Sequence, residues 1–309
     1  MTQKTILSSN GIHRLHHTFF TPKSRPIASL LIVHGMSEHG GRYADFAQFL
    51  ADNGVLVATY DQLGHGQTVK DKYELGFFDE KYPVQILCKD VIIMADKLKE
   101  LAPSVPHFIM GHSMGSFIVR TVLTHHAINF SGVILMGTSN GLSLMGKISL
   151  PLLNLLNQYR PKQINLALAT LLNQHLLNQI RSPISTSPLA WLAENASAID
   201  DFEADELSGF VFTNNGFMTL ISLIDHATHA DWYMNMPKQY PILLISGKDD
   251  PVGNMGQDIE TLHQTLVDAN HTVSVRLYPN MRHDILHEVD REKVCQDILH
   301  WLRQHLKQN

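Results

Sequence analysis

The sequence predicts an α/β protein in which helices flank a mostly parallel, eight-stranded β-sheet. Short runs that are apolar throughout alternate with helical patterns along the first part of the chain. Strands of this kind are buried on both faces, which is typical of parallel sheets with crossover helices. A helical segment then interrupts the alternation, which resumes further along the sequence. We therefore expect one sheet that is interrupted by a helical insertion and then completed.

The first part of the core is predicted over residues 1–140. The runs KTILSS and LHHTFF indicate an antiparallel hairpin at the sheet edge. Apolar strands are expected at 28–33, 55–60, 107–110 and 132–137. Helices are expected at 42–54, 85–101 and 114–127. Gly54 and Pro103 end the first two of these helical patterns, because glycine and proline commonly terminate helices.

A helical insertion is predicted at 141–237, after the sixth strand. It is rich in Leu, Asn and Gln and shows no strand pattern. Four prolines break it into several short predicted helices: Pro151, Pro161, Pro183 and Pro188. Residues 238–309 are expected to complete the core with strands at 240–247 and 272–279 and helices at 256–270 and 292–307.

Composition restricts the class of partner. The formal net charge is −5 and no block of basic residues is present, so we do not expect nucleic acid as a partner. The first residues lack the apolar core of a signal peptide, and no run of about 18 apolar residues could span a bilayer. We expect a cytoplasmic protein, and a loose association with a membrane surface remains open.

Metal and disulfide chemistry are not predicted. The 19 histidines include His13, His16 and His17 and the pair His226 and His229, but no zinc-binding spacing accompanies them. We therefore expect no metal and no cofactor. The two cysteines, at positions 88 and 295, lie far apart in helical patterns and are expected to be reduced, non-catalytic thiols.

The stretch HFIMGHSMGSFIVR places Ser113 between Gly111 and Gly115, where an apolar strand must turn directly into a helix. A Gly-x-Ser-x-Gly pattern alone is weak evidence, but this context is that of the nucleophile turn of α/β-hydrolases. The glycines lack the Cβ atoms that would collide with the neighbouring strand and helix. A simpler interpretation is that Ser113 only caps the helix.

A nucleophilic serine needs a histidine base and an acid that orients it. In this fold the acid and the histidine follow the serine in that order, on loops after late strands. Asp249 and Asp250 follow the strand at 240–247, and His283 follows the strand at 272–279. Each could also be an ordinary turn or loop residue, but three candidates in this order favour a triad.

Two further segments fit the same chemistry. The loop after the strand at 28–33 should donate one N–H of an oxyanion hole, and we assign this donor to Met36. We assign the second donor to Met114, because backbone amides need no particular side chain. The segment DQLGHGQT is expected to be a structural turn, in which the glycines and His65 support the nucleophile loop rather than react.

Five segments carry a family resemblance: HGMSEHGGRY, DQLGHGQT, GHSMGS, GKDDPVG and RHDILHE. Together they resemble the bacterial lysophospholipase and monoacylglycerol lipase group of the α/β-hydrolase superfamily, which belongs to the serine aminopeptidase-like S33 hydrolases. The resemblance covers most of the chain, including DELSGFVFT in the insertion. Thr68 stands where the family usually has serine, and Asp284 where it usually has glutamate.

The resemblance implies several assignments. Asp250 rather than Asp249 would be the triad acid, and the insertion would be a cap over the active site. Glu38 and Arg42 would line the end of the pocket that receives the polar head group. Leucines at helical spacing in the cap could line an acyl site, contact a membrane surface or simply pack on the core.

We therefore expect a serine carboxylic-ester hydrolase that forms an acyl-enzyme on Ser113, with His283 as base and Asp250 as its orienting acid. Monoacyl lipids, either monoacylglycerol or lysophospholipid, are the expected substrates. Alternatives are a small-ester esterase, a proline iminopeptidase-like hydrolase and an inactive binding module. The complete triad and both oxyanion loops argue against the last. The sequence leaves the oligomeric state open.

Overall fold

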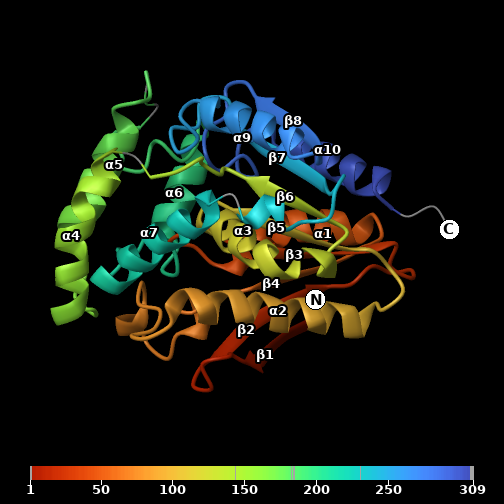
Figure 1. The fold of residues 1–309 in the computed structure, drawn as a ribbon, viewed down its shortest axis with the longest axis horizontal. Helices are drawn as coiled ribbons and strands as arrows, with labels where there is room; N and C mark the ends of the chain where they lie inside the picture. The colour runs from red at the N-terminus through yellow and green to blue at the C-terminus, as the bar shows by residue number, and fades with distance from the viewer. Residues whose placement is uncertain (1, 143, 182, 184, 230, 307–309) are drawn as a thin grey trace.

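The computed structural model describes residues 2–142, 144–181, 183, 185–229 and 231–306 (Figure 1). Its centre is an eight-stranded sheet in the order β1-β2-β4-β3-β5-β6-β7-β8. The strands are β1 (Thr2–Leu7), β2 (Arg14–Phe20), β3 (Ala28–Val33), β4 (Val55–Tyr60), β5 (His107–His112), β6 (Gly132–Met136), β7 (Pro241–Gly247) and β8 (Thr272–Tyr278). The predicted mostly parallel sheet is confirmed.

The strands pair as their composition predicts. β1 and β2 form the expected antiparallel hairpin, and β2 is also antiparallel to β4. From β4 to β8 all neighbours are parallel. The apolar strands β3, β4 and β6 are buried along their whole length. Because the parallel strands point the same way, the loops that follow them gather at one edge of the sheet.

Ten α-helices are described: α1 (Ala44–Asp52), α2 (Pro83–Leu101), α3 (Met114–His126), α4 (Leu144–Tyr159), α5 (Leu166–Leu177), α6 (Ala196–Ala204), α7 (Asn214–Thr228), α8 (Asp231–Met234), α9 (Gln257–Asp268) and α10 (Arg291–Gln304). The helix predicted at 42–54 begins as a short 3₁₀ turn, Gly40–Tyr43, before α1. The helix predicted at 85–101 starts two residues earlier, because Pro83 suits the first turn of a helix.

Helices cover both faces of the sheet. On one face α2, α3 and α9 contribute buried residues such as Val91, Ile118 and Leu262 to a large apolar cluster. On the other face α1 and α10 contribute residues such as Leu50 and Ile298 to a second cluster. This two-sided cover explains why the central strands are apolar on both faces.

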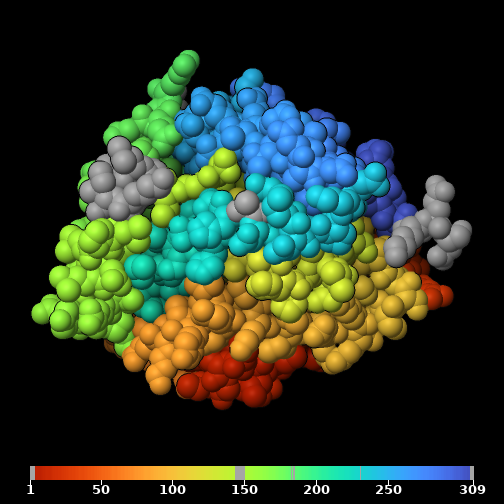
Figure 2. Space-filling view, viewed as in Figure 1, coloured from red at the N-terminus to blue at the C-terminus, as the bar shows by residue number. Residues whose placement is uncertain are grey.

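The insertion contains α4 to α8 and is helical as predicted. α7 and α8 pack against the core helix α3, whereas α4 and α5 lie at the periphery (Figure 1). Figure 2 shows α4 and α5, in light green, on one flank of the molecule. The cap boundaries at 141 and 237 remain a prediction.

The expectation that Pro151 breaks the insertion is wrong, because α4 continues through this residue. A proline inside a helix removes one backbone hydrogen bond and crowds the preceding turn. Pro151 lies on the exposed side of α4, where water can replace the lost bond. Pro151 therefore lies inside a helix and does not end it.

Two further observations concern thiols and membranes. Cys88 and Cys295 are free cysteines, and Cys295 is buried. Among the described residues, no helix is both long enough and apolar enough to cross a membrane.

Candidate active site

Ser113 lies between β5 and α3 with an unusual backbone conformation. Its φ is 50° and its ψ is −120°, a combination that residues other than glycine rarely adopt. The Ser113 N–H donates to the carbonyl of Met136, and the Ser113 carbonyl accepts from Ser116. The side chain of Ser113 is half-buried, whereas the strand before it is buried. The turn therefore presents the serine at the carboxyl edge of the sheet.

The two flanking glycines permit close backbone contacts. A Cβ atom on Gly115 would lie 2.1 Å from the carbonyl oxygen of Val33 at the end of β3. A Cβ atom on Gly111 would lie 2.4 Å from the carbonyl oxygen of Gly115. Both distances are far shorter than any real contact, which confirms the steric reason that the sequence gives for these glycines.

Asp250 and His283 meet at the same edge. The two carboxylate oxygens of Asp250 lie 3.1 and 3.0 Å from His283 Nδ1. Asp250 Oδ2 also accepts from the Ser246 hydroxyl at 2.8 Å, and Oδ1 accepts from the Val252 N–H at 2.9 Å. Asp250 is fully buried, whereas its neighbour Asp249 is exposed. The sequence alone left these two aspartates open, and only Asp250 contacts the histidine.

The environment keeps Asp250 ionised. Burial alone would raise the pKa of this carboxyl, but the His283 ring and the hydrogen bonds to the carboxylate lower the pKa overall. An ionised carboxylate can only accept hydrogen bonds, so we assign the ring proton of His283 to Nδ1. His283 Nε2 is then left as an acceptor for a serine proton.

The His283 ring is enclosed by residues next to Ser113. Its centroid lies 4.9 Å from that of His112, and a Cβ atom on Gly137 would lie 2.9 Å from its Cε1. No hydrogen bond joins Ser113 Oγ to His283 among the described residues. In hydrolases without a bound substrate this contact is often long, and it tightens in the substrate complex.

The loop after β3 runs beside Ser113. A Cβ atom on Gly35 would lie 3.1 Å from Ser113 Cβ, so the next residue, Met36, is adjacent to the nucleophile turn. Met114 is the first residue of α3, where helix amides lack an acceptor within the helix. In the part of the chain that the structure describes, the N–H groups of Met36 and Met114 have no backbone acceptor. Their assignment as oxyanion donors remains a prediction.

His65 supports this loop. Its Nε2 accepts from the Ser37 N–H at 3.3 Å, and its Nδ1 donates to the Leu63 carbonyl at 2.8 Å. The ring is fully buried against Phe210 and Phe212. Burial lowers the pKa of His65 to about 3, so the ring is neutral and can accept. These contacts are structural, but they hold the loop after β3 rather than the nucleophile loop expected from the sequence.

Glu38 and Arg42 belong to a buried polar network. Glu38 Oε1 accepts from the Gly35 N–H and from the Tyr43 hydroxyl, and it lies 3.1 Å from His112 Nδ1. Arg42 Nε lies 3.3 Å from Glu38 Oε2. Both side chains are almost completely buried. Their expected contact with a substrate head group remains a prediction.

The same network includes His112, which directly precedes Ser113. Burial alone would lower the pKa of His112, but the Glu38 carboxylate raises it overall. His112 Nδ1 faces Glu38, and His112 Nε2 lies 3.3 Å from the His283 carbonyl oxygen. Arg42 continues the network to Asp284, at 2.7 Å. The loop after β3, the turn at Ser113 and the loop that carries His283 are thus connected.

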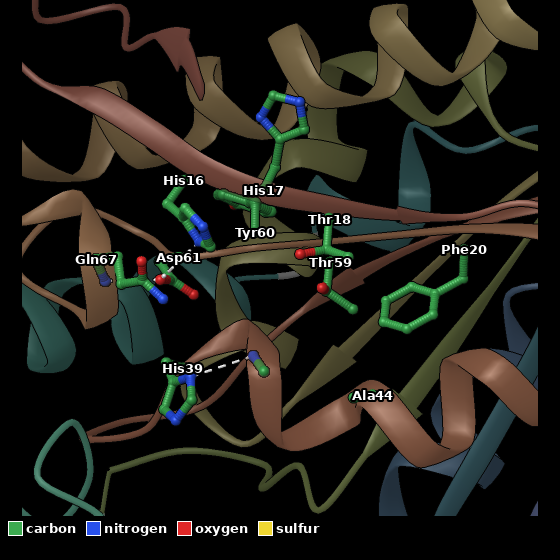
Figure 3. Close-up of a pocket in the computed structure, with 11 residues that line it drawn as sticks. His16, His17, Thr18, Phe20, His39, Ala44, Thr59, Tyr60, Asp61 and Gln67 are labelled. Carbon is green, nitrogen blue, oxygen red and sulfur yellow. Dashed lines mark hydrogen bonds and ion pairs between the residues drawn. The ribbon is translucent and has the colours of Figure 1, made fainter. Parts of the chain in front are cut away.

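A pocket of about 210 Å³ lies beside β2 and the end of the loop that follows β3 (Figure 3). His16 and His39 are among its lining residues, and none of Ser113, Asp250 and His283 is. Asp61 in its wall accepts from the N–H groups of Gly40 and Gln67. Asp61 therefore fixes the loop from behind, which is a structural role. Among the described residues, no cluster of histidine, cysteine or acidic side chains could hold a metal ion.

Sequence reasoning missed three residues that contact the candidate site. His112 was only the variable position of the serine motif, and Asp284 was noted only as a departure from the family pattern. Trp191, from the insertion, lies against His283, with ring centroids 5.4 Å apart. A lone tryptophan in a segment without periodicity gives no local signal of such a contact.

Three comparisons with known proteins point to the esterase and lipase family of α/β-hydrolases. A family model described as serine aminopeptidase, S33, matches residues 24–290. A monoacylglycerol lipase from Mycolicibacterium smegmatis is 24% identical over 95% of this chain and 94% of the relative. A carboxyl esterase from Bacillus coagulans, solved in complex with glycerol, superposes with a TM-score of 0.90, at 27% identity and 98% coverage of both chains.

A shorter match is with the monoglyceride lipase of Mus musculus. It is 33% identical over 118 residues, which cover 38% of this chain and 37% of the relative. The match with this relative therefore spans just over a third of its length.

Proposed function

Because the chain belongs to the serine aminopeptidase S33 family of α/β-hydrolases, we propose that it hydrolyses carboxylic esters of monoacyl lipids through an acyl-enzyme on Ser113. The single observation that carries the proposal is the convergence of Ser113, Asp250 and His283 at one edge of the sheet. The hydrogen bond between Asp250 and His283 Nδ1 supports His283 as the base.

The reaction follows from the positions of these groups. His283 Nε2 takes the Ser113 proton while Oγ attacks the ester carbonyl, and the N–H groups of Met36 and Met114 stabilise the oxyanion. The imidazolium then protonates the leaving alcohol, and the acyl-enzyme remains. Water, deprotonated by the same ring, attacks the acyl-enzyme and releases the carboxylic acid and free Ser113. No cofactor is needed for these steps.

Lipid substrates are supported by the insertion and by the relatives. Leu153 of α4 and Leu176 of α5 are buried, whereas other apolar side chains of this region are exposed. The exposed set is Leu152, Leu155, Tyr159, Ile164, Leu166 and Leu171. We propose that this exposed apolar set makes transient contact with a lipid surface. The relative from Mycolicibacterium smegmatis, named monoacylglycerol lipase and matched over 95% of this chain, supports the monoacyl preference.

A small-ester esterase is the second candidate, because the carboxyl esterase structure resembles this chain along its whole length. A hydrolysis panel of monoacylglycerols, lysophospholipids, short p-nitrophenyl esters and proline amides separates the candidates. The proposal predicts the largest kcat/KM on a monoacyl lipid. A larger kcat/KM on short esters or on proline amides would replace it.

A further inference from the structure

A segment of the insertion, residues 190–195, is tied to the loop that carries His283. We call it the docking segment. The guanidinium of Arg282, which is 1% exposed, donates to the carbonyls of Ala190 and Ala193 and pairs with Glu194 at 2.6 Å. Arg282 directly precedes the proposed base. The cap therefore contacts the loop of the catalytic histidine through a buried charge.

Backbone contacts strengthen this connection. The Asp284 N–H donates to the Leu192 carbonyl at 2.8 Å. Glu288 Oε1 accepts from the N–H of Glu194 at 2.8 Å and from the N–H of Arg282 at 2.9 Å. Such a set of buried hydrogen bonds fixes the docking segment relative to the loop, because each broken bond would leave a buried polar group unpaired.

Trp191 lies in the middle of the docking segment and faces the base. Its ring centroid is 5.4 Å from that of His283, with an angle of 49° between the planes. The indole N–H of Trp191 donates to Asn173 Oδ1 of α5 at 3.1 Å. The orientation of the indole is thus set from both sides, by the docking segment and by α5.

We propose that Trp191 is a positioning residue for His283 in the ester hydrolysis proposed above. Asp250 holds the imidazole at Nδ1, and a ring held at one atom can still tilt about that contact. The direction of Nε2 toward Ser113 depends on this tilt. The aromatic ring of Trp191, which packs against the imidazole, limits the tilt. The Trp191 ring also faces the imidazolium that forms during the reaction, and aromatic faces attract cations at this distance.

The alternative is that Trp191 only lines the acyl-binding site. The two roles differ in the kinetic constant that they change. A positioning residue changes kcat on every ester, since a displacement of about 1 Å can cost on the order of 100-fold in rate. A wall of the acyl site changes KM and acts mainly on long chains. p-Nitrophenyl acetate, whose acyl group is too short to depend on the cap, separates them.

The first experiment compares Trp191→Ala with Trp191→Phe on p-nitrophenyl acetate and on a long-chain p-nitrophenyl ester. We expect Trp191→Ala to lower kcat on acetate by about 10-fold or more, with KM changed by less than about twofold. Trp191→Phe keeps an aromatic face and should stay within about threefold. The matched control is Gln174→Ala, an exposed neighbour of Asn173 on α5, which should leave both constants unchanged.

A second measurement tests the positioning role of Trp191 if Trp191→Ala does not fold. Trp191→Phe removes the indole N–H and Asn173→Ala removes its acceptor, so the two variants break the same hydrogen bond. Each should lower kcat on acetate about two- to threefold, and the double variant should lower it no further. The proposal would be overturned if the double variant lowered kcat by the product of the two single effects, or if Asn173→Ala left kcat unchanged.

The results distinguish a failure of the role proposed for Trp191 from a failure of the proposed function. If Trp191→Ala leaves kcat on p-nitrophenyl acetate unchanged and only raises KM on the long-chain ester, that result contradicts the positioning role and leaves the proposed function intact. Ser113→Ala is measured in parallel on acetate. If that variant keeps its activity, the proposed function itself is wrong.

Discussion

The carboxylate of Asp250 lies 3.0 Å from Nδ1 of His283, and both side chains are buried. Asp249, the next residue along the chain, is exposed and makes no such contact with the ring. Two adjacent aspartates therefore have different environments, and only one of them can hold the imidazole. This pair provides a matched test of the triad.

Asp250→Asn should lower kcat by about 10⁴-fold, because an amide can donate to Nδ1 and so stabilise the wrong tautomer of His283. Asp249→Asn should stay within about twofold of the unchanged protein. Steady-state hydrolysis of p-nitrophenyl esters by the two variants gives both numbers. A larger loss in Asp249→Asn would show that the acid has been assigned to the wrong residue.

Gly115→Ala should destabilise the fold and abolish activity. The new Cβ would lie 2.1 Å from the Val33 carbonyl oxygen, which is backbone and cannot move aside cheaply. We expect a loss of about 3 kcal/mol or more in the free energy of unfolding. Urea unfolding of the variant measures the loss. Gly253→Ala, whose nearest atom would be 3.3 Å away, serves as the milder comparison, and an equal or larger loss there would contradict the steric argument.

The lowered pKa of His65 predicts that the protein loses stability in acid. Its pKa is about 3 in the folded protein and about 6.5 in the unfolded chain. Between these values the unfolded state binds more protons, so the free energy of unfolding falls as the pH is lowered from 6.5 toward 3. His65→Gln keeps an acceptor for Ser37 and cannot titrate, so it should reduce this slope by about one proton. Unfolding curves measured across this range that have equal slopes for both proteins would exclude the assignment.

The cap predicts a preference for substrates with one acyl chain. In the proposed single acyl site under the insertion, a second chain would have to remain in water or displace the insertion. We expect kcat/KM on a monoacylglycerol or a lysophospholipid to exceed that on the matching triacylglycerol or diacyl phospholipid by about tenfold, or 1.4 kcal/mol. Exchange of residues 148–180 for a short polar linker should reduce this ratio. Equal rates on mono-, di- and triacyl substrates in the unchanged protein would reject the prediction.

Much of the fold could be predicted because its signals are local. The apolar strands β3, β4 and β6 could be predicted from their composition, and the turn at Ser113 from its flanking glycines together with the apolar strand before it and the helix after it. Asp250 and His283 are distant in sequence but follow successive strands of one parallel sheet, which brings their loops to one edge. Their catalytic roles remain predictions.

The rest depends on contacts that have no period in the sequence. The pairing of Glu38 with His112 joins the loop after β3 to the end of β5, and that of Trp191 with His283 joins the insertion to the core. Pro151 inside α4 shows the same limit, because the environment of one residue decided whether a helix ended there. Tertiary packing, rather than local sequence preference, determines these contacts and where this helix ends.

The central claim is that Ser113 is the nucleophile, and one measurement tests it most directly. The protein is treated with a fluorophosphonate, and the adduct is located by mass spectrometry of its peptides, with Ser113→Ala treated in parallel. We expect one adduct, on Ser113, together with a loss of esterase activity, and we expect Ser113→Ala to be unlabelled and about 10⁴-fold less active. Labelling at another residue, or esterase activity of more than a few per cent in Ser113→Ala, would contradict the claim.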